Sequence, residues 1–333
     1  MKETKIIKAE PSNLNENEIM PAAEIIASGG LCVFPTETVY GLGANASDPL
    51  AVAKIFEAKG RPQDNPLIVH IWKYEQLFDL VTEVPEKAGV LAEHFWGGPL
   101  TMIFKRSEKV PAVVSAGLDT VAVRLPSHPV ANALIKLSGV PIAAPSANLS
   151  GKPSPTSFKH AAEDMTGRAD AIIDGGNSFF GIESTVIDMT EDVPTILRPG
   201  AITPADIKEL IGEVYLGKGN SGAPKSPGMK YKHYAPRAPL YIVESENPVE
   251  IINSRTKEKT GVINFGYDNS DFKAEYVFNM GKTASEYAAN IFYALREFDD
   301  SDTEEIYAIP PKDDGVGIAV RNRIYKSAGG KVI

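Results

Sequence analysis

Two cations and an amide lie close together after a helical pattern in the first part of the chain. Lys59 and Arg61 flank Gly60, and Asn65 follows in a short loop that also contains Pro62. Gly60 is a typical C-terminal cap and Pro62 prevents the helix from resuming, so both cations are predicted to project from a fixed turn. Cations held in this way can bind several phosphates. Taken alone, such a triplet could equally be a solvated helix end that complements the helix dipole.

A second polar segment offers hydroxyl and amide groups. Ser146, Asn148 and Ser154 lie in a loop that contains three prolines, at positions 145, 153 and 155. Proline fixes the backbone angles of the loop and so limits the entropy that is lost when a ligand binds. We therefore regard these three side chains as candidate ligand-binding groups.

Hydroxyls and arginines also stand near the ends of predicted strands. Thr36 and Thr38 share one face of a strand-exit turn. Arg124 closes an apolar strand, where an arginine usually has a bidentate carboxylate or phosphate partner. Ser184 and Arg198 lie at a strand entrance and a strand exit, and each alone could be a local cap or a surface ion pair.

Short apolar runs alternate with helical patterns up to residue 212, which favours an α/β fold over an all-β one. The strands expected at 184–189 and 195–200 are close enough for an antiparallel hairpin, so we predict a twisted mixed sheet with flanking helices. The loop that follows Gly60 leads into a buried strand pattern containing His70, which is where α/β proteins often place ligands. The predicted strands span residues 31–35, 66–72, 100–106, 120–126, 141–146, 171–176, 184–189 and 195–200. The predicted helices span residues 15–29, 49–60, 85–96, 128–139, 156–167 and 203–212.

The composition divides the chain into a domain at 1–212, a linker at 213–238 and a smaller domain at 239–333. The linker is rich in Gly, Ser, Pro and Lys, and its residues 218–237 carry five cations and no acid. Its aromatic residues, among them Tyr234, favour a lid that lies over a ligand rather than a simple tether. The smaller domain is Rossmann-like in pattern: apolar segments at 239–245, 260–266, 274–280, 304–310 and 315–330 alternate with helices at 249–257 and 285–299.

The composition also excludes several classes of protein. At 333 residues and 43% hydrophobic content, the chain can form two well-packed domains. The absence of a signal-peptide pattern and of a long apolar run predicts a cytoplasmic location with no membrane contact. Cys32 is the only cysteine, which rules out an intrachain disulfide and a zinc ribbon and is typical of a buried strand residue. The five histidines form no HxxxH pair, and the net charge of −9 disfavours broad nucleic-acid binding.

Seven ordered motifs together resemble the YrdC-like domain of the threonylcarbamoyl-AMP synthase family. The remainder of the chain resembles the long form of that family, which has a linker and a small C-terminal domain. The motifs are PTETVYGLGANA (35–46), KGRPQDNPLIVH (59–70), FWGGPLT (95–101), VAVRLPSHP (121–129), PSANLSGKPSPTS (145–157), GIESTVID (181–188) and LRPGAIT (197–203).

This resemblance implies a nucleotidyltransferase that converts L-threonine, bicarbonate and ATP into threonylcarbamoyl-AMP, diphosphate and water. Mg²⁺ would arrive with ATP, without metal ligands from protein side chains, and the product would pass to the machinery that modifies tRNA. The L-threonine pocket would be formed by Thr38, His70, Thr120, Arg124, Ala144 and Ser184. ATP would be bound by Lys59, Arg61, Asn65, Ser146, Asn148, Ser154, Arg198 and Tyr234, with Lys59 and Arg61 as the catalytic cations.

Two other functions fit parts of the pattern. An RNA-binding module is suggested by the basic linker, which would also allow weak binding of tRNA, although the acidic first domain weighs against it. Carbamoyl transfer of the hydrogenase-maturation type uses proteins that share the YrdC-like domain. That reaction requires zinc-binding cysteine pairs, which a chain with one cysteine does not have.

Overall fold

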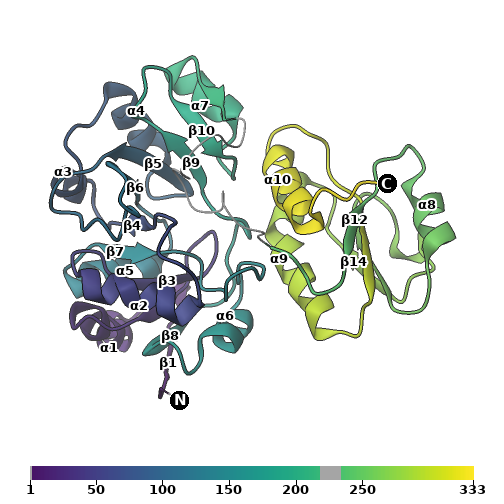
Figure 1. Cartoon of the computed structure of the whole chain (residues 1–333), viewed down its shortest axis with the longest axis horizontal. Coiled ribbons are helices and arrows are strands. Elements are labelled where there is room, and N and C mark those ends of the chain that lie inside the picture. The colour runs from purple at the N-terminus through teal and green to yellow at the C-terminus, as the bar shows by residue number, and fades with distance from the viewer. Residues whose placement is uncertain (1, 218–233) are drawn as a thin grey trace.

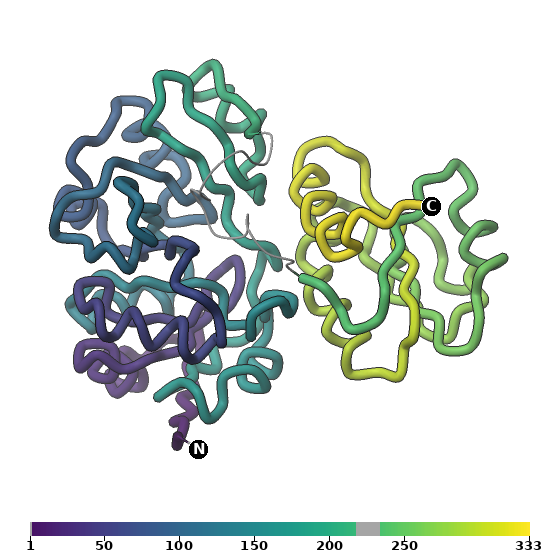
Figure 2. Tube along the Cα trace, viewed as in Figure 1, coloured from purple at the N-terminus to yellow at the C-terminus, as the bar shows by residue number. Residues whose placement is uncertain are grey.

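A computed structural model describes residues 2–217 and 234–333, and Figures 1 and 2 show that they form two lobes. The larger lobe contains one eleven-stranded sheet and the smaller lobe a four-stranded sheet. The strands of the larger lobe are β1 (Lys5–Lys8), β2 (Cys32–Phe34), β3 (Gly41–Asn45), β4 (Ile68–His70), β5 (Leu100–Lys105), β6 (Thr120–Arg124), β7 (Ile142–Ala144), β8 (Ala171–Asp174), β9 (Thr185–Asp188), β10 (Thr195–Arg198) and β11 (Tyr215–Leu216). Those of the smaller lobe are β12 (Leu240–Ile242), β13 (Thr260–Asn264), β14 (Tyr276–Asn279) and β15 (Glu305–Ala308).

Helices flank both sheets, and among the described residues none is both long and apolar enough to cross a bilayer. The helices of the larger lobe are α1 (Glu16–Ala27), α2 (Pro49–Lys59), α3 (Leu77–Leu80), α4 (Glu86–Phe95), α5 (Pro129–Ser138), α6 (Phe158–Met165) and α7 (Pro204–Ile211). Those of the smaller lobe are α8 (Pro248–Arg255), α9 (Ala284–Asp300) and α10 (Gly317–Ala328).

Helix α2 shows how the local sequence builds one side of the site. Its N-terminus is capped by Asp48, whose carboxylate accepts a hydrogen bond from the backbone N–H of Leu50 at 2.9 Å. The helix ends at Gly60, whose φ of 64° lies in the left-handed region that favours glycine. Lys59 is thus the last helical residue and Arg61 begins the loop, so the C-cap predicted from the sequence is confirmed.

The large sheet brings the ends of several strands together. Its strand order is β1-β8-β2-β3-β7-β4-β6-β5-β9-β10-β11, with parallel and antiparallel pairs mixed. Strands β4 and β6 run parallel, so His70 and Arg124 are register partners. On the other side of β4, Ile68 pairs with Ala144 of the antiparallel strand β7. The antiparallel hairpin of β9 and β10 is present as predicted, and the expected mixed α/β sheet with flanking helices is confirmed.

The predicted strands and helices of the larger lobe are all present, but the sequence did not indicate strands β1, β3 and β11 or the short helix α3. Strand β1 is a short edge strand with one buried residue. Strand β3 has the sequence GLGAN, which lacks the branched residues typical of strands. A side chain at Gly43 would lie 2.7 Å from Ile142 and 2.8 Å from the Phe34 ring, so close packing and not strand propensity selects glycine there. Cys32, in the neighbouring strand β2, is fully buried as predicted.

The smaller lobe is a parallel α/β layer, with the strand order β12-β15-β13-β14. Figure 1 shows α9 and α10 on the side of this sheet that faces the larger lobe, and α8 on the opposite side. The expected second, smaller α/β domain is therefore confirmed. The segment 315–330 does not continue the strands but forms helix α10, because Ala319, Val320, Arg323 and Ile324 recur at helical spacing and are all buried.

The region predicted to be a linker is only partly described. Within residues 213–238, strand β11 pairs in parallel with β10 at the edge of the large sheet. The segment 218–233, which carries the cations Lys218, Lys225, Lys230 and Lys232, lies outside the described residues.

Candidate active site

One pocket gathers most of the residues that the sequence singled out. It lies in the larger lobe, where strands β4, β6 and β7 adjoin the proline-rich loop and the entrance to β9. The predicted residues that line it are Thr36, Thr38, Arg61, His70, Arg124, Ala144, Ser146, Asn148, Ser154, Ser184, Arg198 and Tyr234. Groups that are far apart in the sequence thus face one volume.

Arg124 is held by three groups at the end of β6. Its Nη2 donates to Glu37 Oε1 at 2.6 Å, its Nη1 donates to the hydroxyl of Thr38 at 2.9 Å, and its Nε donates to the carbonyl of Gly98 at 3.2 Å. Burial acts to raise the pKa of the Glu37 carboxyl, but the charge and hydrogen bond of Arg124 outweigh it and the pKa is lowered. Each terminal nitrogen of a guanidinium carries two N–H groups, so this fixed fork retains donors for the carboxylate of a substrate.

His70 lies beside Arg124 on the neighbouring strand. Burial, together with the positive charge of Arg124, lowers the pKa of His70 to about 3. The ring is therefore neutral at physiological pH and packs edge-on against Phe34, with 6.1 Å between ring centroids. A neutral, buried imidazole is suited to binding a substrate rather than to carrying a proton between pH 6 and 8.

The low pKa of His70 should make the stability of the protein depend on pH. A histidine in the unfolded chain titrates near pH 6.5, whereas the folded value is about 3, so between these values the unfolded state binds more protons. The contribution of His70 to stability should be complete above about pH 6.5 and fall by up to about 1.4 kcal/mol per pH unit as the pH drops toward 3. Urea unfolding of the wild type and of His70→Gln between pH 7.5 and 4.5 measures this difference. A difference in unfolding free energy that stays constant from pH 7.5 to 4.5 would contradict the low pKa of His70 in the folded protein.

Arg198 and Ser184 form a second polar cluster. Arg198 Nε donates to the backbone carbonyl of Ser184 at 3.0 Å, and its Nη2 donates to the Ser184 hydroxyl at 3.1 Å. That hydroxyl also lies 2.8 Å from the hydroxyl of Thr101. Burial lowers the pKa of Arg198 to about 10, so the guanidinium remains charged at neutral pH. Arg198 is therefore a buried charge in the wall of the pocket and not a surface ion pair.

Lys59 supports the pocket from behind its lining. The side chain is buried, and its ammonium donates to the backbone carbonyls of Ser146 and Asn148. Burial, together with the nearby charge of Arg61, lowers the pKa of Lys59 well below the ordinary value. The structure thus joins the two segments identified in the sequence: the last residue of helix α2 fixes the loop that carries the candidate ligand groups.

Two other predicted residues do not line the pocket. Asn65 is fully buried; its carbonyl accepts a hydrogen bond from Arg61 Nη2 at 3.1 Å, while its side-chain amide has no partner among the described residues. Thr120 begins strand β6, four residues before Arg124 on the same face. Asn65 therefore acts on the site through Arg61, and Thr120 lies at the far end of the strand.

Two carboxylates were missed by the sequence analysis. Glu37 holds Arg124, and Glu183 lines the pocket. Glu183 Oε1 accepts a hydrogen bond from the Ser154 hydroxyl at 2.6 Å, and its Oε2 lies 3.1 Å from Nε of Arg323. Burial acts to raise the pKa of Glu183, but the charges of Arg323 and then Arg198 lower it to about 2. The partner of Glu183 is 140 positions away, so local sequence gives no signal for this pair.

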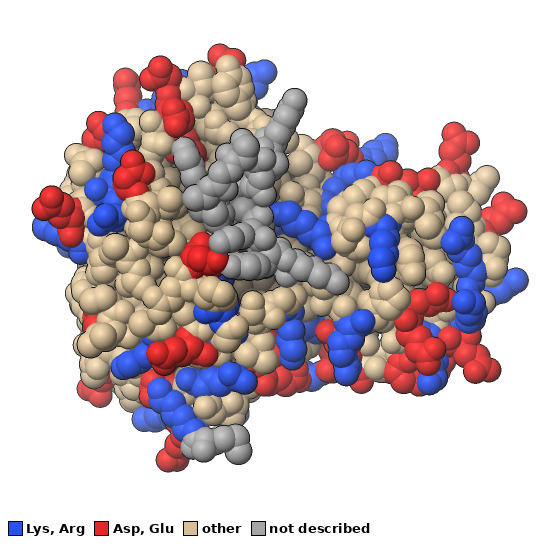
Figure 3. Space-filling view, viewed as in Figure 1, with Lys and Arg blue, Asp and Glu red and all other residues tan. Residues whose placement is uncertain are grey.

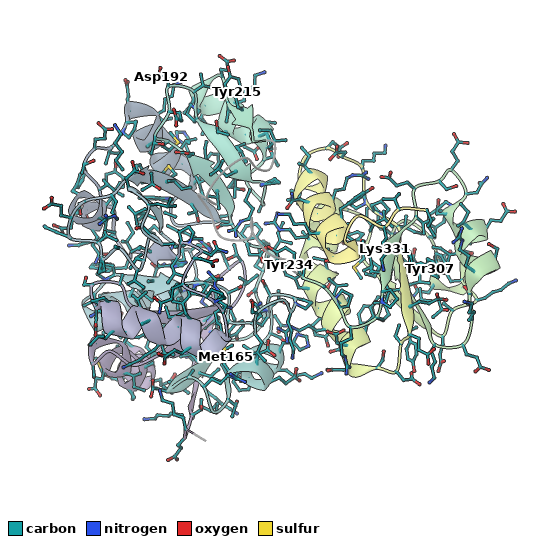
Figure 4. The ribbon with its side chains drawn as sticks, viewed as in Figure 1. Met165, Asp192, Tyr215, Tyr234, Tyr307 and Lys331 are labelled. Atoms are coloured by element: carbon teal, nitrogen blue, oxygen red, sulfur yellow. The ribbon has the colours of Figure 1, made fainter. Side chains whose placement is uncertain are left out.

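Tyr234 connects the pocket with the smaller lobe. Figure 4 shows it between the two lobes, and its ring stacks on Phe292 of helix α9 with 4.9 Å between centroids and an interplanar angle of 28°. Its φ of 62° is unusual for a residue with a side chain. Burial, followed by the charge of Glu183, raises the pKa of the phenol, which stays neutral. The end of the predicted linker therefore contributes directly to the pocket wall.

A mixed α/β sheet with arginines at its strand ends, joined to a small parallel α/β domain, defines the class of two-domain YrdC-like enzymes. A family model described as "Telomere recombination" matches residues 24–200, and one described as "Threonylcarbamoyl-AMP synthase, C-terminal domain" matches residues 202–329. The chain belongs to the threonylcarbamoyl-AMP synthase family, whose members are enzymes that form an AMP adduct.

Proteins of similar length match along nearly the whole chain. The threonylcarbamoyl-AMP synthase of Pyrococcus abyssi is 50% identical and that of Bacillus subtilis 48% identical, each over 96% of this chain and over 96% and 95% of their own lengths, respectively. A crystal structure of P. abyssi Sua5 complexed with L-threonine has a TM-score of 0.94 and 48% identity, and the match covers 99% of both chains. The similarity therefore includes both lobes.

Proposed function

We propose that the pocket combines L-threonine, bicarbonate and ATP into threonylcarbamoyl-AMP, with release of diphosphate and water. The arrangement of three arginines around one pocket supports this proposal: Arg61, Arg124 and Arg198 provide positive charge for a carboxylate and a triphosphate side by side. The L-threonine complex of the similar P. abyssi protein supports the choice of amino acid.

The chemistry consists of two bond-forming steps. The neutral amine of threonine attacks the carbon of bicarbonate, or of carbon dioxide derived from it, and an N-carboxylate forms with loss of water. An oxygen of this carboxylate then attacks the α-phosphorus of ATP, the bond from that phosphorus to the bridging oxygen breaks, and diphosphate leaves. Neither step requires a side-chain nucleophile, so catalysis would depend on alignment and on stabilisation of the charge that develops at phosphorus.

Each pocket residue has a distinct role in this proposal. Arg124 binds the threonine carboxylate while Glu37 and Thr38 hold its fork in place. Arg61 and Arg198 stabilise the phosphates, and Lys59 keeps the Ser146 to Asn148 loop in position. The remaining residues that the resemblance assigns to the two substrates are His70, Thr120, Ala144 and Ser184 for threonine and Asn65, Ser146, Asn148, Ser154 and Tyr234 for ATP.

Mg²⁺ would enter the pocket as part of the MgATP substrate. Glu183 is the one carboxylate among the described residues that line the pocket, and it pairs with Arg323, while Glu37 behind Arg124 pairs with that arginine. Phosphate oxygens are then the natural ligands of the ion. Away from the pocket, one cluster has the spacing of metal ligands: His160, Glu297 and Asp300. Its two carboxylates already pair with the ammonium of Lys159, which lies 3.2 Å from Glu297 and 3.1 Å from Asp300.

The labile adenylate would be consumed in the cytoplasm by the machinery that transfers the threonylcarbamoyl group to tRNA. Direct binding of RNA by this chain should be weak. Figure 3 shows that positive and negative side chains alternate over the described surface of one face, which does not form a continuous basic field. Filter binding of tRNA at several salt concentrations tests this expectation, since binding through phosphates weakens steeply with salt.

The proposed reaction is tested by diphosphate release with L-threonine, ¹⁴C-bicarbonate and MgATP. Release of diphosphate should require all three substrates, and one labelled adenylate should form per diphosphate. Omission of L-threonine or of Mg²⁺ is the control. Diphosphate release that is independent of threonine would indicate a different adenylating reaction.

A further inference from the structure

We propose that Arg323 and Arg296, two buried arginines of the smaller lobe, are positioning residues for the ATP half of the pocket. This inference rests on the proposed function and assigns a role to the C-terminal domain. Neither arginine lines the pocket itself. Each one crosses to the larger lobe and fixes the backbone beside residues that we assign to ATP: Arg323 acts beside Arg198, and Arg296 acts beside Asn148 and Ser154. Arg323 also lies beside Ser184, which the resemblance assigns to threonine.

Arg323 holds two chain segments at once. The side chain is fully buried, its Nε donates to Glu183 Oε2 at 3.1 Å, and its Nη1 donates to the carbonyl of Pro199 at 2.6 Å. Glu183 directly precedes Ser184, and Pro199 directly follows Arg198. A single guanidinium therefore fixes the entrance of β9 relative to the exit of β10, the two places from which Ser184 and Arg198 reach the pocket.

Arg296 acts in the same way on the proline-rich loop. Its Nε and Nη2 donate to the carbonyl of Pro153 at 3.0 Å and 2.6 Å, and its Nη2 lies 2.7 Å from Asp164 Oδ2. The same carboxylate oxygen accepts a hydrogen bond from the backbone N–H of Leu149 at 3.1 Å. Both ends of the segment from Asn148 to Ser154 are thus tied, directly or through Asp164, to helix α9.

The two lobes are packed closely enough for such contacts to be rigid. A Cβ at Gly181 would lie 2.4 Å from Cα of Ala289 in helix α9, so only glycine allows this approach. Val39 and Ile182 of the larger lobe belong to the hydrophobic core of the smaller lobe. The helices that carry the two arginines are therefore packed firmly against the larger lobe. A positioning role requires such a rigid contact.

The charge of Arg323 has a second effect on the pocket. Glu183 lines the pocket and its pKa is low, so it carries a negative charge beside the proposed phosphate site. With Arg323 in contact, that charge is compensated; without it, the carboxylate would repel a triphosphate. The group that binds the threonine carboxylate does not depend on the smaller lobe, because Arg124 is held by Glu37, Thr38 and Gly98 of the larger lobe itself. Loss of the two arginines should therefore affect ATP more than threonine.

The test is a set of binding measurements on the full chain. Isothermal titration calorimetry gives Kd values for L-threonine and for α,β-methylene-ATP with Mg²⁺, in the wild type, Arg323→Met, Arg296→Met and the double variant Arg323→Met/Glu183→Gln. The matched control is Arg321→Met. Arg321 lies two residues away on the same helix, but its guanidinium contacts Glu244, Tyr325 and Pro311 within the smaller lobe.

We expect Arg323→Met and Arg296→Met to weaken nucleotide binding by about tenfold and threonine binding by less than about twofold. Arg321→Met should leave both Kd values unchanged. The double variant leaves no unpaired carboxylate, so it should keep the wild-type melting temperature even if Arg323→Met is unstable, and it should still bind nucleotide more weakly because Pro199 is no longer held.

Nucleotide Kd values within twofold of the wild type in the folded variants would overturn the positioning role, as would an equal loss of threonine and nucleotide binding. Failure of the proposed function would look different, since the wild type itself would then not bind the two ligands or release diphosphate.

Discussion

Arg61→Ala is expected to lower the rate of threonylcarbamoyl-AMP formation by about a hundredfold or more, the scale for removal of a group that stabilises transition-state charge. The guanidinium lies 5.5 Å from the ring centroid of Phe56 and donates to the carbonyl of Asn65, so it is held at the pocket by the turn after helix α2. Because the side chain is only partly buried, its removal should leave the melting temperature nearly unchanged. Diphosphate release under saturating substrates measures the effect.

Arg168→Ala is the matched control for this prediction. Arg168 is exposed and donates to the carbonyl of Ala58 near the same end of helix α2, at 3.2 Å, but it does not line the pocket. It should keep wild-type turnover. Arg61→Lys should recover only part of the rate, because an ammonium restores the charge without the planar fork of donors. Turnover by Arg61→Ala within about threefold of the wild type would remove this residue from the catalytic machinery.

Arg124→Met should lower the free energy of unfolding by about 3–5 kcal/mol and abolish measurable binding of L-threonine. The stability loss arises because Glu37 would remain buried with no countercharge, 2.6 Å from where the guanidinium had been. Urea unfolding and calorimetry with threonine measure the two effects. The double variant Arg124→Met/Glu37→Gln removes both charges, and it should regain stability while still failing to bind threonine. Threonine binding by this double variant would show that Arg124 is a structural residue only.

The ion pair of Glu37 and Arg124 should make the stability of the protein fall at low pH. The pKa of Glu37 is lowered in the folded protein, so its pairing with Arg124 contributes stability above the unfolded value of about 4.3. This contribution is lost as the pH falls through the lower folded value. The stability difference between the wild type and the double variant should therefore be constant from pH 7 to 5 and shrink below about pH 4.

Features that depend on neighbouring residues could be predicted from local sequence. The cap at Gly60, the hairpin of β9 and β10 and the burial of Cys32 all follow from short-range patterns, and the structure confirms them. Strand β3 was missed because close packing against Phe34, and not intrinsic preference, makes its glycines a strand.

Features that depend on contacts between distant parts of the chain could not be predicted from local sequence. The sequence identified Arg124 as a cation in need of a partner, but it did not reveal that Glu37 is that partner. It also did not reveal that the ammonium of Lys59, which the resemblance places beside the phosphates, contacts the backbone carbonyls of Ser146 and Asn148. The ion pair of Glu183 with Arg323 joins residues 140 positions apart in different lobes, and only the fold brings them together.

The buried thiol of Cys32 makes this chain a convenient background for site-directed labelling. Burial raises the pKa of that thiol, so almost no reactive thiolate is present at neutral pH. Maleimide dyes should therefore react only with cysteines that are introduced on purpose, such as Glu24→Cys on the exposed face of α1 and Glu250→Cys on α8. A donor–acceptor pair at these sites would report the separation of the lobes in solution by fluorescence, with the native cysteine left in place.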